Sequence, residues 1–314
     1  KGVLTQTRRH STIVSLLGIR HVVLAVNKMD LVDYSQARFD EIVAEYREFA
    51  GKIGLTDITA IPLSALKGDN VVSLSAAMPW YPGPALMPWL EAVEVDEFRM
   101  QAAPFRLPVQ WVNRPNQEFR GFAGTIAAGT VKSGDRVRVL PSGRESTVSR
   151  IVTHGGDLPL AVAGQSVTLT LRDEIDISRG DVICTAAAPA EVADQFETTL
   201  VWMHDDPLLV GRQYWLKTGG STVPVQVTDL KYRLNITTLE HLAAKTLALN
   251  EIGVANIALD RPIAFDPYTA NRDTGGFILI DRLTNATVGA GMIHFALRRA
   301  HNIHVQAVDV DKAV

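Results

Sequence analysis

Four consecutive residues, Asn27-Lys28-Met29-Asp30, have the types and spacing that can read a purine base. A carboxylate at Asp30 can accept two hydrogen bonds, which suits the neighbouring ring N–H and amino donors of guanine but not the edge of adenine. A site that depends on buried polar pairing rejects the mismatched base strongly. The stem of Lys28 can lie over the base plane, and Asn27 can join this loop to its neighbours. The pattern Asn-Lys-x-Asp therefore predicts a guanine-nucleotide site.

A second tripeptide, Ser64-Ala65-Leu66, follows the next apolar strand along the chain. In GTPases a backbone N–H of such a loop donates to the guanine O6. The tripeptide alone carries little information, and Asn and Asp are common in ordinary strand-to-turn segments. Two motifs in register after consecutive strands favour the functional interpretation over the turn.

The sequence contains no G-x-x-x-x-G-K-[ST] motif. Gly51-Lys52 is followed by Ile53 and lies within a predicted helix, and residues 273–276 match D-x-x-G only far downstream. Phosphoryl transfer needs a phosphate cradle and Mg²⁺ ligands. We therefore predict no catalytic residue and no metal ligand in this chain. We expect GTP and Mg²⁺ as cofactors, with the phosphate-binding residues and the Mg²⁺ ligands in an upstream segment of a longer protein.

The guanine-reading motifs need a parallel sheet, because α/β sheets hold ligands at the carboxyl ends of their strands. Residues 21–26 form a short apolar run typical of a parallel strand covered on both faces. Residues 35–53 repeat apolar positions every three or four residues and predict an amphipathic helix. Residues 58–63 predict the second strand. An earlier helix over 5–17, with Gly18 after its end, and a short helix between 86 and 95 complete this part.

The pattern changes after Pro104 to short β-rich runs divided by turn residues. Such spacing predicts barrels. The expected strands are 105–112, 121–127, 136–140, 147–153, 166–171 and 181–185, then a linker over 186–193, then 213–217, 223–234, 252–259 and 277–283. Residues 132–135 and 141–144 predict hairpin loops.

Composition excludes several classes of protein. The 314 residues are 46% hydrophobic, and 31 Lys+Arg nearly balance 34 Asp+Glu. Without a basic run, nucleic-acid binding is not expected. No apolar run approaches the roughly 20 residues that cross a bilayer, so no membrane association is expected. The single cysteine, Cys184, indicates a cytoplasmic setting, and a small buried side chain is its expected role. The histidines lack ligand spacing, except His301 and His304 near the end.

Residues 1–91 resemble the later part of an elongation-factor-Tu-like GTPase domain, on Thr5-Gln6-Thr7-Arg8-Arg9-His10 and on residues 80–84 (WYPGP) besides the two motifs. This resemblance implies an α/β, partial P-loop GTPase domain followed by two all-β barrel domains. The domains are expected at 1–97, 98–190 and 191–297, with 298–314 as a tail or linker.

Longer segments are similar to the large GTPase subunit of bacterial sulfate adenylyltransferase. They are residues 108–116, 119–124, 173–181, 247–253, 261–268 and 277–291. The resemblance implies a GTP-driven enzyme that makes adenylyl sulfate and pyrophosphate from ATP and sulfate with a smaller, ATP-using catalytic subunit. Residues 298–306 resemble the lead-in to a fused adenylylsulfate kinase domain. Because the residues for phosphate and Mg²⁺ contacts are missing, this chain alone is expected to be inactive.

The segment 109–124 interleaves aromatic and polar residues between turns. Arg114 and Arg120 are the expected partner contacts, since arginine is enriched at interfaces. In the alternative interpretation Trp111 and Phe122 form barrel core and the polar residues solvate a loop. Two other functions remain open: an elongation-factor-type GTPase that delivers aminoacyl-tRNA, which shares the Asn-Lys-x-Asp motif, and a non-enzymatic β-barrel interaction module.

Overall fold

The computed structural model describes residues 2–93, 97–117 and 119–297. It divides into two compact units. The first comprises Lys1–Arg99 with Leu234–Leu242, and the second comprises the rest of the chain from Met100. Each unit is described by itself.

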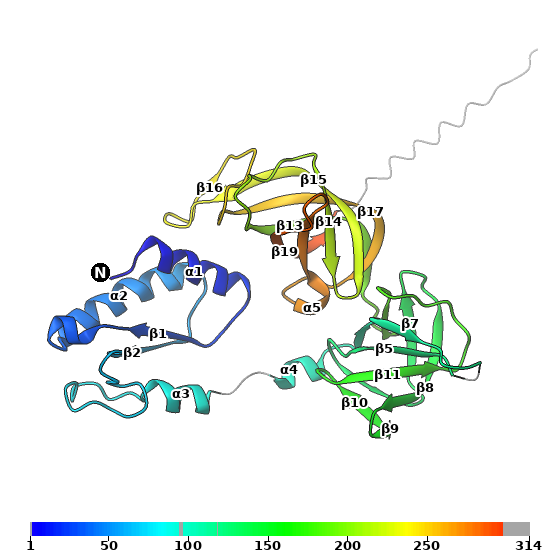
Figure 1. Ribbon diagram of the computed structural model, residues 1–314, viewed down its shortest axis with the longest axis horizontal. Coiled ribbons are helices and arrows are strands. Elements are labelled where there is room, and N and C mark those ends of the chain that lie inside the picture. Colours follow the sequence, from blue (N-terminus) through cyan, green and yellow to red (C-terminus); the bar gives the residue numbers. More distant parts are fainter. Residues whose placement is uncertain (1, 94–96, 118, 298–314) are drawn as a thin grey trace, which may run out of the picture. The chain divides into compact units, whose positions relative to one another are not determined.

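The first unit contains the α/β elements that carry both guanine-reading motifs (Figure 1). They are α1 (Thr5–Leu16), β1 (Val22–Val26), η1 (Met29–Val32), α2 (Gln36–Lys52), β2 (Ile58–Pro62) and α3 (Leu86–Ala92), and the short helix α4 (Glu97–Ala102) contains the boundary with the second unit. Strands β1 and β2 are parallel, with register from Val22 opposite Ile58 to Val26 opposite Pro62. The two motifs therefore follow strand ends at the same edge of the sheet.

Helix α2 forms for the reason that the sequence predicts. Its apolar residues Phe39, Val43, Tyr46, Phe49 and Ala50 are buried and pack with residues of β1 and β2. The Ser35 side chain accepts a hydrogen bond from the backbone N–H of Arg38, 3.4 Å away, which satisfies a donor at the helix start. At α1, Gly18 follows the C-cap with a φ of +67°, a conformation that glycine adopts readily.

The prediction that the first strand is covered on both faces is wrong. Residues Val22–Leu24 are half-buried and Ala25 is exposed. Among the described residues β1 and β2 form a two-stranded sheet, so each strand is an edge. An unbroken apolar run therefore does not by itself show that both faces of a strand are buried, because burial also requires neighbouring elements that pack on each face.

The second unit begins with an eight-stranded antiparallel sheet in the order β3-β12-β7-β8-β11-β5-β4, with β9 paired to β8. A separate pair, β6 with β10, lies beside it. Its strands are β3 (Arg106–Pro108), β4 (Trp111–Asn113), β5 (Gly121–Thr125), β6 (Thr130–Lys132), β7 (Arg136–Leu140), β8 (Glu145–Thr153), β9 (Gly156–Leu158), β10 (Leu160–Val162), β11 (Ser166–Leu171) and β12 (Val182–Thr185). The residues buried inside include Leu107, Ile151 and Leu169.

The second sheet closes into a six-stranded barrel, because β14 pairs with both β18 and β15. The order is β14-β18-β19-β13-β17-β15, with β16 outside the ring. Its elements are β13 (Glu191–Trp202), β14 (Gln213–Thr218), β15 (Ser221–Leu234), β16 (His241–Leu242), β17 (Ile252–Phe265), α5 (Arg272–Gly275), β18 (Gly276–Asp281) and β19 (Thr287–Ala296). Phe196, Trp202, Tyr214 and Phe265 fill the core.

Two β-rich predictions need correction. The expected strand 105–112 is divided into β3 and β4, because β3 pairs with β12 whereas β4 pairs with β5. The chain changes partner between Val109, whose N–H donates to Asp181, and Gln110, whose N–H donates to Ala123. The expected linker 186–193 also ends early: β13 starts at Glu191, which lies opposite Phe265.

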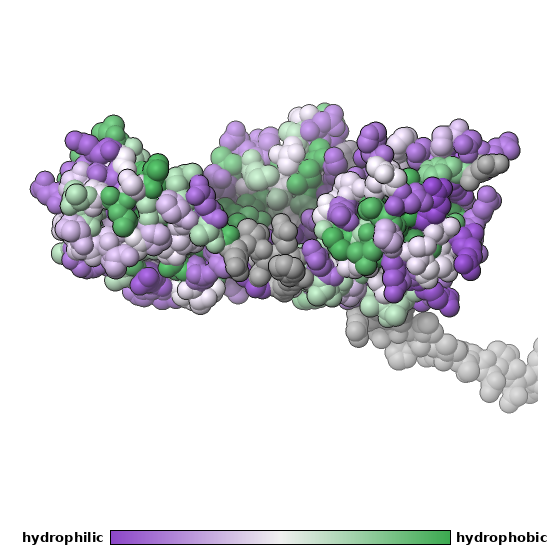
Figure 2. Space-filling model, turned by 90° about the horizontal axis from the view of Figure 1, so that it is seen from below, coloured by the Kyte–Doolittle hydropathy of each residue, from purple (hydrophilic) through white to green (hydrophobic). Residues whose placement is uncertain are grey.

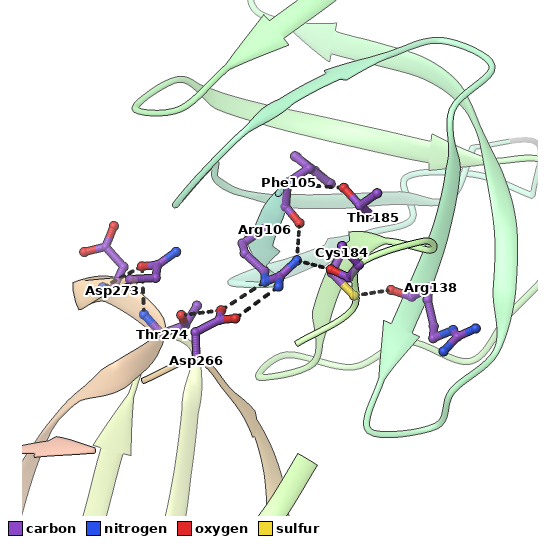
Figure 3. A network of polar contacts seen from close by, with 10 residues as sticks. Phe105, Arg106, Arg138, Cys184, Thr185, Asp266, Asp273 and Thr274 are labelled. Carbon is purple, nitrogen blue, oxygen red and sulfur yellow. Dashed lines mark hydrogen bonds and ion pairs between the residues drawn. The ribbon is translucent and has the colours of Figure 1, made fainter. Parts of the chain in front are cut away.

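A buried ion pair joins the two sheets of the second unit (Figure 3). Arg106 is 5% exposed, and its guanidinium donates to Asp266 through Nε at 2.9 Å and Nη2 at 3.0 Å. It also donates to the carbonyls of Phe105 and Ala188. Thr274 donates to the same Asp266 carboxylate at 2.8 Å. Planar, two-point pairing of this kind restricts orientation as well as distance.

Candidate functional site

The loop after β1 turns sharply at Lys28, which has φ +67° and precedes the 3-10 helix η1. Met29 is 1% exposed and packs in the core with Val26, Phe39 and Val43. Its backbone N–H donates to the Leu63 carbonyl, 3.2 Å away at the end of β2. Burial of Met29 thus fixes the loop, while Lys28 and Asp30 on either side face outward to different degrees: Lys28 is exposed and Asp30 is half-buried.

Asn27 joins the two motifs directly. Its Oδ1 accepts hydrogen bonds from the backbone N–H of Lys28 at 2.7 Å and of Ala65 at 3.0 Å. One amide oxygen therefore holds the two strand-end loops together. The structure brings the two motifs into contact although 38 positions separate Asn27 from Ala65.

The second loop is a tight turn built on Ser64, which is fully buried. Ser64 and Asp69 form an isolated antiparallel bridge, and the Ser64 hydroxyl accepts from the Lys67 N–H at 3.3 Å. Ala65 and Leu66 lie at the exposed tip, where Leu66 is 86% exposed. The turn therefore presents its tip to solvent beside the first motif.

The chemistry of the remaining donors and acceptors fits a guanine base. Among the described residues, the Asp30 carboxylate accepts no hydrogen bond, so both oxygens are available to a ligand. The Ala65 N–H is used by Asn27, whereas the Leu66 N–H makes no hydrogen bond within the described part of the chain. A carboxylate with two free acceptors on one loop and a free amide donor on the other match, in type, the N–H, amino and O6 groups of guanine.

Tyr34 and Asp69 are site neighbours that no sequence pattern indicates. The Tyr34 hydroxyl donates to Asp69 at 2.8 Å across 35 positions of chain, and the Ser75 hydroxyl donates to the other carboxylate oxygen at 2.7 Å. The hydrogen bond to Asp69 raises the pKa of Tyr34, with burial and the negative charges of Asp69 and Asp30 acting in the same direction. Because the spacing of Tyr34 and Asp69 follows no helical or strand period, only the fold reveals their contact.

The segment expected to bind a partner has mixed exposure. Phe122 is 2% exposed and belongs to the core, but Trp111 is 63% exposed, so the alternative that places Trp111 in the core is wrong. Its neighbour Val112 packs against the core instead, as expected where successive residues of a strand face opposite sides. Arg114 is exposed, and Arg120 lies 3.4 Å from Asp176 and over the Phe122 ring.

Other side chains give no second site in the described part of the chain. No group of three or more His, Cys, Asp or Glu there could hold a metal ion, and His301 and His304 lie outside the described residues, as does the tail 298–314. Cys184 is fully buried beside Leu140 and Ala264, and burial raises the pKa of its thiol. No described helix has the length and apolar character of a membrane span.

Three protein-family models match this chain. The elongation factor Tu GTP-binding domain matches residues 1–84, elongation factor Tu domain 2 matches 123–184, and the GTP-eEF1A C-terminal domain-like family matches 195–294. Their order is the order of the α/β part and the two barrels. The fold is therefore part of an elongation-factor-Tu-like GTPase domain followed by two β-barrels.

Similar curated proteins cover nearly the whole chain. The bifunctional enzyme NodQ of Rhizobium sp. (strain N33) is 56% identical over 100% of the chain and 48% of its own length. The bifunctional enzyme CysN/CysC of Xylella fastidiosa (strain Temecula1) is 55% identical over 99% and 50%. Sulfate adenylyltransferase subunit 1 of Laribacter hongkongensis is 56% identical over 94% and 61%. The chain thus spans about half to three fifths of these relatives.

The solved structure of sup35 complexed with GDP has the same fold. It superposes with a TM-score of 0.59 over 93% of this chain and 74% of that one, at 24% identity. A second sup35 structure, complexed with GMPPNP, gives the same score.

Proposed function

Because the chain belongs to the family of elongation-factor-Tu-like proteins that includes sulfate adenylyltransferase subunit 1, we propose that it is part of the GTP-binding subunit of a sulfate adenylyltransferase. In that enzyme GTP hydrolysis drives the formation of adenylyl sulfate and pyrophosphate from ATP and sulfate. The catalytic work on ATP belongs to a smaller partner subunit. Two relatives are named sulfate adenylyltransferase subunit 1, which supports such a partner.

One observation carries the proposal at the level of chemistry: Asn27 Oδ1 bonds both Lys28 N and Ala65 N. This contact ties the two strand-end loops to each other, which supports a site in which an acceptor of one loop and a donor of the other contact the same base. We assign the guanine N–H and amino groups to Asp30 and the guanine O6 to the Leu66 N–H. Lys28 covers the base, Met29 anchors its loop, and Ser64 and Ala65 shape the second loop.

The phosphates and Mg²⁺ would be held by residues outside this sequence, which has no phosphate-cradle motif. When bound, Mg²⁺ neutralises charge that develops on the transferred phosphoryl group. The residues of this chain bind and orient the base only. We therefore propose that residues 1–314 alone do not hydrolyse GTP and bind it far more weakly than the whole protein does.

The expected domains, 1–97, 98–190, 191–297 and the tail 298–314, form part of this proposal. The names of the bifunctional relatives support a fused kinase domain in the whole protein. Arg114 and Arg120, which lie just after β4 and just before β5, are proposed contacts to the smaller subunit. No nucleic acid or membrane partner is proposed, and the assembly is placed in the cytoplasm.

Affinity capture followed by an activity assay tests the function. The full-length protein would be used as bait in a bacterial lysate, and the captured complex assayed for pyrophosphate released from ATP and sulfate with and without GTP. The proposal predicts capture of a smaller ATP-using subunit and pyrophosphate release that rises on adding GTP. Capture of aminoacyl-tRNA with no sulfate-dependent release would instead indicate an elongation-factor function. If the bait captured neither the smaller subunit nor aminoacyl-tRNA, the protein would be an interaction module.

A further inference from the structure

The two base-reading loops are joined a second time, through Tyr34 and Asp69. Tyr34 follows η1, and its hydroxyl donates to Asp69 Oδ2 at 2.8 Å. The Asp69 backbone in turn exchanges hydrogen bonds with Ser64 at 3.1 and 3.2 Å. The path from η1 through Tyr34 and Asp69 therefore ends at the residue that starts the second loop.

Tyr34 is held tightly at its own backbone. Its N–H donates to the Met29 carbonyl at 2.9 Å, and its carbonyl accepts from the Trp80 indole at 3.1 Å. Asp33 and Tyr34 both have positive φ, +48° and +55°, a region that non-glycine residues enter only when surrounding contacts impose it. The chain thus holds an unfavourable backbone conformation at the position that directs the ring toward Asp69.

Asp69 is held from the other side. Its Oδ1 accepts from the Ser75 hydroxyl at 2.7 Å, and the neighbouring Asn70 is 1% exposed, with its amide donating to the Pro62 carbonyl at 2.8 Å. Each oxygen of the Asp69 carboxylate therefore has one donor. A carboxylate fixed at both oxygens is a rigid anchor for the Tyr34 hydroxyl.

We propose that Tyr34 is a positioning residue for guanine recognition: its bond to Asp69 holds Asp30 and the Leu66 amide at the spacing that one guanine base spans. The proposal rests on the proposed guanine-nucleotide function. Fixing the two loops before binding lowers the ordering cost at the moment of binding, which raises affinity for the base that fits. A tyrosine hydroxyl is already protonated at neutral pH, and the hydrogen bond to Asp69 raises the pKa of Tyr34 further, so the hydroxyl stays a donor.

The test removes one oxygen atom. In the full-length protein, Tyr34→Phe keeps the ring and deletes the bond to Asp69. Titrations with GDP and with IDP, which lacks the amino group that Asp30 reads, would measure affinity and base selectivity. We expect GDP affinity to fall about tenfold, the factor for one hydrogen bond to a charged acceptor, and the ratio of GDP to IDP affinity to fall with it.

Tyr81→Phe is the matched control. The Tyr81 hydroxyl donates to the carbonyls of Ala60 and Pro84, both at 3.2 Å, and its ring packs against Phe39 as part of the same core. This variant should change the melting temperature as much as Tyr34→Phe does, without changing the GDP-to-IDP ratio. In an Asp69→Ala background, Tyr34→Phe should cause no further loss.

Three results would overturn the assignment of Tyr34. The wild type could prefer GDP over ADP while Tyr34→Phe retains wild-type affinity and selectivity. Both tyrosine variants could lose the same factor, which would indicate general destabilisation. In the Asp69→Ala background, Tyr34→Phe could still lower GDP affinity by the full factor of about ten. Failure of the proposed function is distinct, because then the wild type itself would not prefer GDP over ADP.

Discussion

Single side chains in this protein act mainly by satisfying backbone donors that loops leave open. Asn27 does so between the two motifs, and Asp281 does so in the hairpin between β18 and β19. Asp281 is 5% exposed, and its Oδ1 accepts from the N–H groups of Leu283 and Thr284, both at 2.9 Å. Arg212 pairs with the other oxygen. These bonds favour the charged carboxylate.

A pH-dependent stability follows from Asp281. The backbone bonds from Thr284 and Leu283, with Arg212, lower its pKa. A carboxyl group whose pKa is lower in the folded state stabilises the fold above its unfolded value, roughly pH 4, and this contribution is lost as pH falls further through the folded pKa. We expect Asp281→Ala to lower the free energy of unfolding by about 2 kcal/mol at pH 7, with a smaller deficit at pH 3.

Urea unfolding at the two pH values measures this difference. Asp176→Ala is the control, since the Asp176 side chain is 97% exposed and pairs with Arg120 at 3.4 Å. Surface pairs of this kind contribute little. A deficit for Asp281→Ala that stays constant from pH 7 to pH 3 would mean that the carboxylate charge does not stabilise the hairpin.

The sequence indicates candidate residues for reading the base, but it does not indicate the contacts that hold their loops. Asn27 and Ala65 belong to short motifs with chemical meaning, and the expected role of Asn27 in joining loops is confirmed by its bond to Ala65. Asp69 and Tyr34 belong to no motif. Their contact depends on the parallel pairing of β1 with β2, which is a property of the fold.

At the scale of elements, the sequence predicts helices and strands with a regular apolar repeat well. It does not predict where the chain changes from one partner strand to another. Helix α2 was expected over 35–53 and spans Gln36–Lys52, because one apolar face decides it. Strand β11 matches its expected range, 166–171. The break between β3 and β4 and the early start of β13 depend on distant partner strands. Local pattern contains no information on those partners.

The strand pair β4–β5 is the element proposed to contact the smaller subunit. Apolar and polar side chains are mixed over the face shown in Figure 2. Trp111 of β4 is 63% exposed. Charge reversal by Arg114→Glu with Arg120→Glu should weaken association with the partner at least tenfold, because arginine contacts are common hot spots. The melting temperature should change little.

Arg144→Glu with Arg172→Glu gives the same change in net charge at two exposed positions of the same part of the chain. Titration calorimetry with the purified smaller subunit would compare both double variants with the wild type. The docking assignment requires loss of binding in the first pair alone. Unchanged binding, or a collapsed melting transition, would show that Arg114 and Arg120 have a structural role or none.

At the scale of the molecule, a buried ion pair and a small apolar cluster both join the two barrels of the second unit. Asp266→Ala would leave the Arg106 guanidinium, whose side chain is 6% exposed, without its carboxylate. Removing one partner of a buried pair costs about 3–5 kcal/mol, while replacing both with apolar residues costs much less. Asp266→Ala should therefore unfold at a clearly lower temperature than Arg106→Met with Asp266→Leu.

Asp273→Ala, at an exposed position of helix α5 next to Thr274, serves as control and should melt nearly like the wild type. Differential scanning calorimetry would separate the transitions. If Asp266→Ala melts like Asp273→Ala, the ion pair does not hold the barrels together, and the apolar cluster of Leu140, Val182, Cys184, Ala190 and Ala264 must do so.

The most direct measurement of the central claim uses the full-length protein assembled with its smaller subunit. Asp30→Asn replaces the acceptor of guanine's N–H and amino groups with an amide, which suits xanthine because its extra carbonyl can accept from the new amino group. We expect pyrophosphate release from ATP and sulfate to depend on GTP in the wild type and on XTP in Asp30→Asn. If the variant keeps its response to GTP and gains none to XTP, Asp30 does not read the nucleotide that drives the reaction.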